Sequence, residues 1–522
     1  MTFFANLTRA GTIALSVWAV APMLTQAVQA ETPQDTLVVG KSADADNLDP
    51  AVTMTNNSWT ITYPAYERLV QFKVEDGRGL TEVEPSLAAS WTTSEDGLTW
   101  TFKLAPGHMF DDGTPVDAAA VKASFDRLLA VGKGPSETIG PVAEIQAPDA
   151  ETVVFTLKEP FGPFLSALAT NGASIVNPSF AEHEKDGDLG QAYLAEHTLG
   201  SGPYRLESWE KDQQFVLVPN PHYSGPKPAL SKIVVKVIKE ATARRLQLEN
   251  GDIDIVEELP IDQLDTLKGT EGVTVVDEPS FYVTYLYLNN THPPLDNPKV
   301  RQALSYAVDY QGIIDGILLG RGIQMQGPVP VGMWAHDDNA KQYNYDPDKA
   351  RAMLEEAGVK DLSLTFVYAK SDPNWDSIGL VLQQYLADIG VELVLREHAY
   401  PTMREKLNTG DFDIAPGNWT PDYGDPSMFM NYWFDSRLHG LAGNRAFYTN
   451  PAVDEMIRTS VNLTDQSKRE ALYLDAQKLI MEDAPYILLF QKNYTFAMRD
   501  NVKGFVYNPM LLQMFNFESM SK

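Results

Sequence analysis

Two kinds of hydrophobic pattern alternate along the chain, and they predict strands and helices respectively. Short runs of β-branched, aromatic and aliphatic residues, several of them apolar at every second position, are typical of strands. They occur at residues 36–39, 100–105, 152–157, 215–218, 232–238, 282–288, 362–367, 391–395 and 486–490. The predicted strands are therefore spread over the whole length of the chain.

Apolar residues spaced three and four positions apart predict helices between these strands. The predicted helices are residues 118–129, 242–249, 298–314, 346–357, 378–389, 454–461 and 468–482. Residues 298–314 are expected to form one amphipathic helix. Its apolar face would carry Val300, Ala303, Leu304, Ala307 and Val308. Strands that alternate with helices predict an α/β fold in which helices cover mixed sheets.

The length of the chain and the order of its elements predict more than one domain. A chain of 522 residues exceeds the usual size of a single hydrophobic core. From about Tyr282 onward the sequence has a strand–helix–strand series of its own, which indicates a second lobe. Ligands of open α/β folds bind beyond strand ends, and clefts between lobes are favoured sites. We therefore expect a ligand site between two lobes.

The first thirty residues are typical of a secretory signal peptide. Arg9 supplies a charge near the start, residues 11–23 are an apolar run, and Val28 and Ala30 stand where a signal peptidase reads. This run is shorter than the ~20 residues of a membrane-spanning helix. We expect cleavage after Ala30 and a soluble exported protein, with an uncleaved membrane anchor as the alternative.

The cysteine content and the net charge limit which compartment and which binding partners are expected for this protein. The chain has no cysteine, which excludes thiol catalysis and the lipidated cysteine of many exported lipoproteins. An exported protein without a tether is expected in a periplasm. The formal net charge is −29, without a basic stripe. This charge disfavours nucleic acids and anionic membranes as partners.

Sequence motifs for catalysis and for cofactors are missing. The eight histidines are isolated, and none has the spacing of metal ligands. Gly40-Lys41-Ser42 resembles the end of a phosphate-binding loop, but Asp35 stands where the upstream glycine is required. The nucleophile motif G-x-S-x-G is absent. We predict no catalytic residue, no metal and no cofactor.

The stretch 418–433, NWTPDYGDPSMFMNYW, has the highest density of candidate binding residues. Asp422 and Asp425 could be the carboxylate pair of an exported glycoside hydrolase. Three residues apart in a turn rich in glycine and proline, they need not face one cleft. Either could instead cap a turn or the helix that begins near Ser427. The hydrolase is therefore the more distant alternative.

Six separated blocks resemble the periplasmic solute-binding proteins of ABC transporters in the peptide/opine/nickel family. The blocks are 47–50 (NLDP), 66–69 (YERL), 85–128, 200–204 (GSGPY), 289–309 and 450–454 (NPAVD). Block 85–128 has the family's order of Trp, Asp-Gly, Phe, Phe-x-x-Gly and Ala-x-x-Val. The resemblance extends over nearly the whole chain after the signal peptide.

The resemblance implies a two-lobed α/β fold with mixed sheets and two strands that cross between the lobes. Lobe I would comprise residues 31–66, 193–281 and 491–522, lobe II residues 282–490, and an extra subdomain, residues 67–192, would be inserted in lobe I. The lobes would close over a ligand, and the closed monomer would dock on the permease subunits of an ABC importer. Such a protein binds and releases its ligand and is not an enzyme.

The resemblance also implies site residues. Asp422 stands where the family's aspartate takes the α-ammonium group of a bound peptide, with Trp419 and Tyr423 beside it. Tyr282, Tyr285 and Tyr400 resemble wall positions of the oligopeptide receptors; ordinary core packing is the alternative for these tyrosines. Asn57 could donate hydrogen bonds from lobe I, unless it belongs to a helix cap.

Two positions depart from the family pattern. Asp376, followed by Ser377, stands where dipeptide receptors have an arginine for the peptide carboxylate. Pro416 stands where oligopeptide receptors have one. The departures disfavour a free dipeptide and favour a longer, blocked or cationic peptide. The same receptor could also take an opine or sugar conjugate, a metal chelate or an amino-acid derivative. Arg404, Arg437 and Arg445 are candidate replacement anchors that are otherwise expected on the surface.

Overall fold

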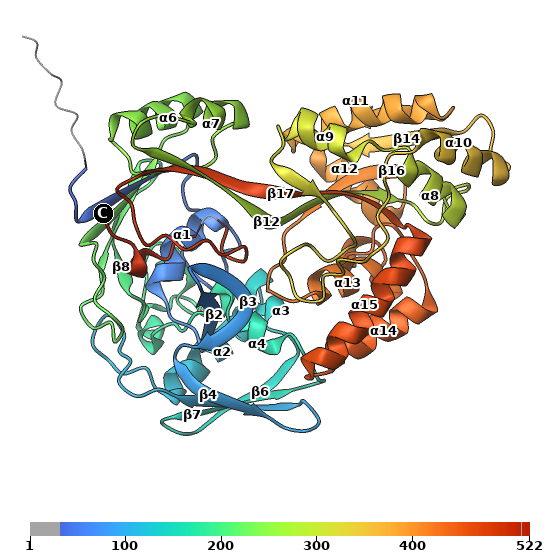
Figure 1. Ribbon diagram of the computed structural model, residues 1–522. Helices are drawn as coiled ribbons and strands as arrows, with labels where there is room; N and C mark the ends of the chain where they lie inside the picture. Colours follow the sequence, from blue (N-terminus) through green and yellow to red (C-terminus); the bar gives the residue numbers. More distant parts are fainter. Residues whose placement is uncertain (1–31, 513) are drawn as a thin grey trace, which may run out of the picture.

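One large mixed sheet runs through both halves of the molecule (Figure 1). The computed structural model describes residues 32–512 and 514–522. Within these residues the sheet has eleven strands in the order β15-β14-β16-β12-β17-β11-β1-β10-β9-β8, with β13 paired to β17. The strands are β1 Thr36–Lys41, β8 Tyr204–Glu210, β9 Gln214–Pro219, β10 Lys232–Val237, β11 Ile255–Val256, β12 Val273–Leu288, β13 Gly322–Gln324, β14 Ser363–Tyr368, β15 Glu392–Glu397, β16 Ile414–Trp419 and β17 Tyr486–Arg499.

The sheet contains both parallel and antiparallel pairs. Strand β1 runs parallel to β10 and β11, and β14 runs parallel to β15 and β16. The central pair β12 and β17 is antiparallel. The predicted α/β fold with mixed sheets is confirmed.

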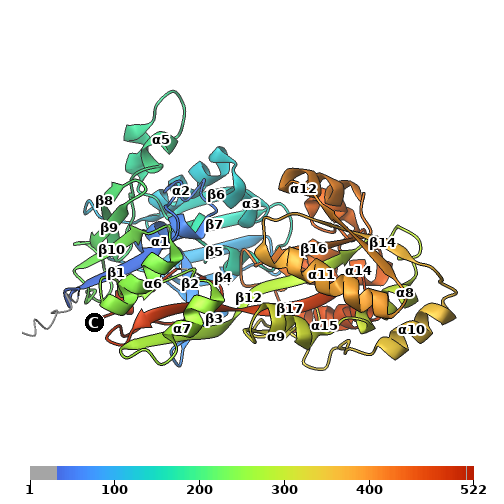
Figure 2. The same ribbon diagram turned by 90° about the horizontal axis from the view of Figure 1, so that it is seen from above.

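Strands β12 and β17 connect the two lobes. They pair from Val273 with Arg499 to Tyr287 with Tyr486, and Figures 1 and 2 show them crossing from one half of the molecule to the other. The pairing register shifts between Pro279 and Tyr282, and again between Thr284 and Tyr285. Such irregularities bend a strand and increase its twist.

Helices cover the sheet in both lobes (Figures 1 and 2). The first lobe has α1 Asn56–Ala65, α6 Ala241–Asn250 and α7 Ile261–Leu267. The second lobe has α8 Pro298–Tyr306, α9 Tyr310–Ile317, α10 Pro347–Glu356, α11 Pro373–Asp388, α12 Tyr400–Thr409, α13 Ser427–Phe434, α14 Pro451–Asn462 and α15 Gln466–Asp483. The second lobe has its own large core, centred on residues such as Phe366, Leu382 and Trp433.

A separate body of strands and helices lies beside the large sheet. It contains β2 Val70–Glu75, β3 Arg78–Pro85, β4 Ala88–Thr93, β5 Thr99–Leu104, β6 Val142–Asp149, β7 Thr152–Leu157, α2 Ala118–Val131, α3 Gly134–Thr138, α4 Phe164–Ala167 and α5 Gln191–Leu194. Strands β4, β5, β7 and β6 form one antiparallel sheet. Phe102, Phe125, Phe155 and Phe164 pack in a core of its own.

This body also contacts the second lobe opposite the crossing strands. The Gly162 backbone N–H donates to the Val461 carbonyl oxygen at 2.7 Å. The rings of Phe161 and Tyr423 meet edge to face, with centroids 6.2 Å apart. The second lobe therefore contacts the rest of the molecule at two places, the crossing strands and this body.

The prediction of one helix over residues 298–314 is wrong. Helix α8 ends at Tyr306, and α9 begins at Tyr310 with Asp309 as its cap. The Asp309 carboxylate accepts from the Gly312 backbone N–H at 2.9 Å. Aspartate side chains favour such caps over a helix interior, so the chain turns there while Ala307 and Val308 remain buried.

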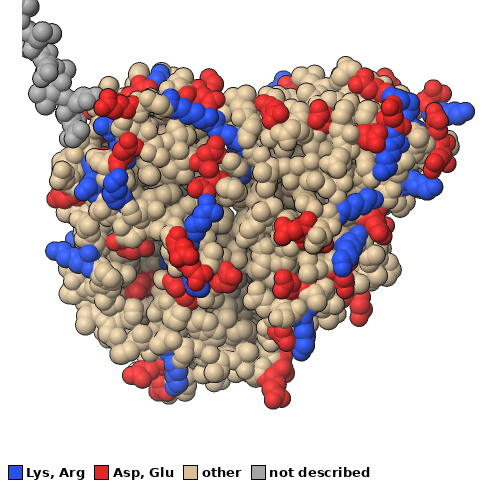
Figure 3. Space-filling model, in the orientation of Figure 1, with Lys and Arg blue, Asp and Glu red and all other residues tan. Residues whose placement is uncertain are grey.

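The predicted signal peptide, residues 1–30, lies outside the described residues. Within the part of the chain that is described, no helix is both long enough and apolar enough to cross a bilayer. Acidic and basic side chains are interspersed on the face shown in Figure 3, without a continuous basic patch there.

Candidate functional site

The candidate site is built on the end of β16 and the loop that follows it. Strand β16 is buried from Ile414 to Gly417 and becomes half-buried at Asn418 and Trp419. It is held between β12 and β14 by ladder hydrogen bonds. Strand β14 pairs with the start of β16, at Ile414, and β12 pairs with it as far as Trp419. The pairing with β12 therefore positions the last residues of β16 and the start of the following loop.

Asp422 lies in this loop as a half-buried carboxylate. Burial raises the pKa of Asp422 from 3.8 to about 6. Among residues 32–512 and 514–522 it has no hydrogen-bond or ion-pair partner. A carboxylate in such a place favours a cation, because Coulomb attraction strengthens where water is excluded.

Trp419 forms an aromatic wall beside Asp422. Its indole stacks on the Tyr432 ring, with centroids 4.9 Å apart and planes 22° from parallel. The Trp419 Nε1–H is buried and has no acceptor in the described part of the molecule. Buried donors are normally satisfied, so this N–H is a candidate donor to a bound ligand.

The two aspartates of the loop have different roles. Asp425 is buried and forms a bidentate ion pair with Arg469, both N–O distances being 2.8 Å. Its Oδ1 also accepts from the Ser427 backbone N–H at 2.9 Å, at the start of α13. Asp425 is thus structural, and the carboxylate pair required by the hydrolase alternative is not available.

A cavity of about 320 Å³ opens beside β16 in the second lobe. It brings together two of the predicted tyrosines, Tyr282 and Tyr400. Its other lining residues are Tyr287, Ser371, Asp372, Trp375, Met403, Arg404, Leu407, Pro416, Gly417 and Asn418. Aromatic walls with a few polar groups are typical of small-ligand sites.

Hydrogen bonds around Asn418 hold the floor of this cavity. Its Nδ2 donates to Asp372 Oδ2 at 2.6 Å, and its Oδ1 accepts from the Thr284 hydroxyl at 3.0 Å. Trp375 Nε1 donates to the same Oδ1 at 3.4 Å, and the Tyr282 hydroxyl donates to Asp372 Oδ2 at 3.2 Å. The network joins β12, β16 and the start of α11.

The remaining predicted residues are dispersed. Tyr285 is 1 % exposed and packs against Trp433 and Tyr486, which is the core packing that the sequence left open. Tyr423 packs between the lobes. Asn57 lies in the first turn of α1, and its Oδ1 is buried without a donor in the described residues. Asp376, in the first turn of α11, accepts from the Tyr368 hydroxyl at 2.8 Å.

Sequence reasoning missed Asp372, Trp375 and Asn418. Asp372 could have been found as a helix cap before Pro373, because it accepts from the Asn374 backbone N–H. Asn418 stands next to the predicted Trp419, but the sequence gives no sign that its amide contacts two other segments.

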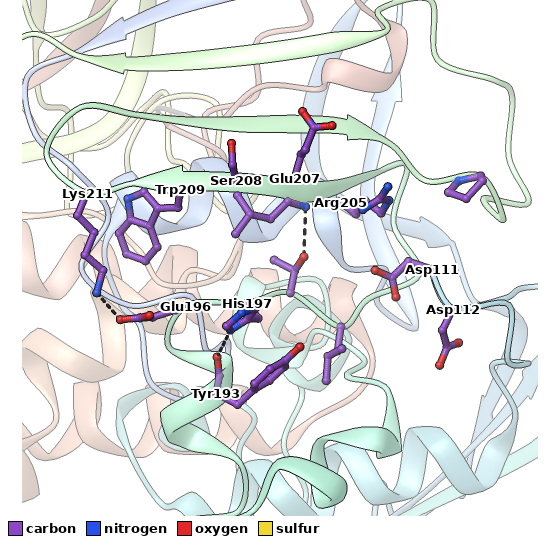
Figure 4. Close-up of a pocket in the computed structure, with 14 residues that line it drawn as sticks. Asp111, Asp112, Tyr193, Glu196, His197, Arg205, Glu207, Ser208, Trp209 and Lys211 are labelled. Atoms are coloured by element: carbon purple, nitrogen blue, oxygen red, sulfur yellow. Dashed lines mark hydrogen bonds and ion pairs between the residues drawn. The ribbon is translucent and has the colours of Figure 1, made fainter.

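A larger cavity, of about 570 Å³, lies beside β8 in the first lobe (Figure 4). Strand β8 is the edge strand at the end of the large sheet away from β16. Trp209 and Lys211 of β8 and its following turn line one side, and Tyr193 and His197 line the other (Figure 4). Lys211 is paired with Glu196 across it. This cavity is not between the lobes, and its charges are mixed. Over the described residues, no group of three or more His, Asp or Glu side chains is placed to hold a metal ion.

Comparison with known proteins decides the family. The sequence model described as "Bacterial extracellular solute-binding proteins, family 5 Middle" matches residues 82–438. The chain belongs to this family. It is therefore a solute-binding receptor, and its relatives are binding proteins as well.

Relatives of this solute-binding protein extend over nearly the whole chain. It is 53 % identical over 494 residues to a probable D,D-dipeptide-binding periplasmic protein of Escherichia coli, covering 94 % of this chain and 95 % of that one. A dipeptide-binding protein of Escherichia coli is 28 % identical, covering 99 % of each chain. A periplasmic binding protein of Helicobacter pylori, solved with the peptide STSA, has a TM-score of 0.75 and 29 % identity over 93 % of this chain and 98 % of that one. The predicted two-lobed architecture is confirmed.

Proposed function

We propose that this solute-binding protein captures a short peptide with a free amino terminus, and that a D,D-dipeptide is its ligand. Asp422 would bind the α-ammonium group, and Trp419 and the cavity at Tyr282 and Tyr400 would contact the rest. The observation that carries the proposal is the unpaired, half-buried Asp422 carboxylate in the loop that faces the inserted body. The relative at 53 % identity, named for D,D-dipeptides, supports this ligand class.

The proposal includes the setting in which the receptor works. The lobes would hinge where β12 and β17 lose register, close to the predicted boundaries at 281/282 and 490/491. The protein would act in the periplasm as a monomer and deliver its ligand unchanged to the permease of an ABC importer. Asn57 on α1 would face the ligand from lobe I, while Tyr285, Tyr423 and Asp376 would support the site.

Isothermal titration tests the ligand class. We expect D-Ala-D-Ala to bind with one site per chain, and L-Ala-L-Ala and N-acetyl-D-Ala-D-Ala to bind much more weakly. Asp422→Asn should weaken D-Ala-D-Ala by about 30-fold to about 4,000-fold, the cost of removing one partner of a buried charge pair. Asp348→Asn, at an exposed aspartate, is the matched control.

Two results would overturn the proposal. One is equal binding of the free and the N-acetylated dipeptide. The other is a chemically altered dipeptide recovered after incubation, since mass spectrometry should find the bound ligand unchanged.

A further inference from the structure

We propose that Arg404, supported by Arg445, forms the subsite for the carboxylate of the ligand. The inference rests on the proposed function and adds the residue that anchors the second end of the peptide. Neither arginine stands at a position where the family resemblance places one.

Arg404 reaches the cavity from α12. It is half-buried and lines the cavity that contains Tyr282 and Tyr400. Its guanidinium carbon lies 6.0 Å from the centre of the Tyr400 ring. No carboxylate of the described residues is within ion-pair distance of it. By contrast, Arg437 pairs with Asp435, and Arg469 pairs with Asp425.

Arg445 adds a second positive charge in contact with α12. It is only 6 % exposed, so it is not the surface residue that the sequence predicted. Its Nε donates to Asn408 Oδ1 at 3.0 Å, and one NH2 group donates to the Leu441 carbonyl at 3.3 Å. No carboxylate among residues 32–512 and 514–522 pairs with it. Asn408 lies one helical turn after Arg404, so the two cations flank one turn of α12.

Uncompensated buried charge is costly, and buried cations are normally paired. The cavity's own acid, Asp372, does not supply the pair. Its oxygens already accept from the Asn374 N–H, the Tyr282 hydroxyl and the Asn418 amide. A ligand carboxylate would complete the charge balance, and a guanidinium can grip it with two parallel hydrogen bonds.

The two charged subsites are connected along β16 and its loop. Asn418 lines the cavity together with Arg404. The next residue, Trp419, stacks on Tyr432, and Asp422 follows in the same loop. A short peptide held by its ammonium group at Asp422 would extend along Trp419 toward this cavity.

Arg404 replaces the anchors that are missing from this chain. Asp376 and Pro416 stand where the family resemblance places carboxylate-binding arginines. Pro416 and Arg404 line the same cavity, so Arg404 supplies from α12 the guanidinium that position 416 lacks.

Titration with D-Ala-D-Ala and its C-terminal amide tests the assignment. The wild type should bind the acid at least about 30-fold more tightly than the amide, because the amide lacks the charge that Arg404 pairs with. Arg404→Gln should lose this preference and bind acid and amide alike. Arg437→Gln, at an arginine that is 66 % exposed and paired with Asp435, should keep it. Melting curves of each variant confirm that the chain is folded.

The outcomes separate this inference from the proposed function. If Arg404→Gln keeps the full preference for the acid, the carboxylate subsite lies elsewhere and the inference is overturned, while the receptor role stands. If the wild type binds neither the acid nor the amide, the proposed function fails and the inference fails with it. Loss of the preference only in Arg404→Gln supports both.

Discussion

At the scale of single residues, the loop after β16 separates two aspartates that look alike in the sequence. Asp425 has two strong partners in Arg469 and the Ser427 N–H. Asp422 has none among the described residues, and burial alone raises its pKa to about 6. Asp425 therefore stabilises the empty protein. Asp422 destabilises the empty protein when it is ionised, and it can bind a cationic group of a ligand.

We predict that ligand affinity depends on pH through Asp422. An ammonium ligand needs the ionised carboxylate, so affinity should fall as the pH drops below about 6, by up to about tenfold per unit. Binding near pH 6 should release a proton. Titration calorimetry in buffers of different ionisation enthalpy measures both effects. Asp422→Asn should remove them.

We also predict that Asp422→Asn raises the melting temperature of the empty protein at pH 8. The raised pKa means that folding favours the protonated form, so the stability contribution of Asp422 is present at low pH and is lost as the pH rises from 3.8 through about 6. The difference between variant and wild type should therefore vanish near pH 3.5. A constant difference across the pH range would contradict this assignment.

Only some of the site residues could be predicted from the sequence. Asp422 and Trp419 were found because they belong to a family segment. Asp372 and Asn418 were not found, because their roles depend on hydrogen bonds between segments 46 residues apart. Exposure of Arg404 and Arg445 depends on how α12 packs, which local sequence does not determine.

At the scale of elements, the contact between β16 and β12 determines the shape of the cavity. Gly417 faces the rings of Tyr285 and Tyr287. A Cβ there would lie 2.6 Å and 2.7 Å from ring carbons. Real Cβ atoms do not approach that closely. A glycine is therefore required at position 417 because there is no room for a side chain, and not because the backbone has a positive φ.

We predict that Gly417→Ala destabilises the protein by about 1–3 kcal/mol, the typical cost of overpacking, and weakens ligand binding because Asn418 moves. Urea denaturation and calorimetry measure the two effects. Gly316→Ala is the control. Gly316 lies in α9 with open space around its Cβ position, so we expect a neutral effect or a gain of about 0.5–1 kcal/mol. Equal effects at both glycines would refute the argument.

Periodicity predicted most of these elements but not their ends. The sequence predicted a strand only at residues 282–288, the apolar second half of β12. In the structure β12 begins at Val273. Its first half begins with the β-branched residues 273–276 (VTVV), a strand signal that the prediction missed. It continues through Asp277, Glu278 and Pro279, which disfavour a strand but pair with β17. Tertiary pairing overrode local preference here.

At the scale of the whole molecule, two points across the space between the lobes are in contact. Thr81 of β3 lies near Gly424 of the site loop. A Cβ on Gly424 would be 3.1 Å from Thr81 Cβ, slightly short of the 3.5–4.5 Å of disulfides. Since the chain has no cysteine, a cysteine pair placed here has no competing partner.

We predict that Thr81→Cys combined with Gly424→Cys forms a disulfide that keeps the lobes closed. Under oxidising conditions the association rate of the ligand should fall at least about tenfold, because entry requires opening. Reduction should restore it. Thr81→Cys alone should behave as the wild type in both conditions, and stopped-flow fluorescence of the tryptophans can follow the binding.

The position of β17 has a consequence for how the chain is made. This strand follows all the other strands of the large sheet along the chain, yet it pairs with β12, β11 and β13 and so contributes to both lobes. Neither lobe can complete its sheet until residues 486–499 have been synthesised. Contacts of such high sequence separation form slowly, so the growing chain stays incompletely folded, and we expect a chain truncated before β17 to be degraded.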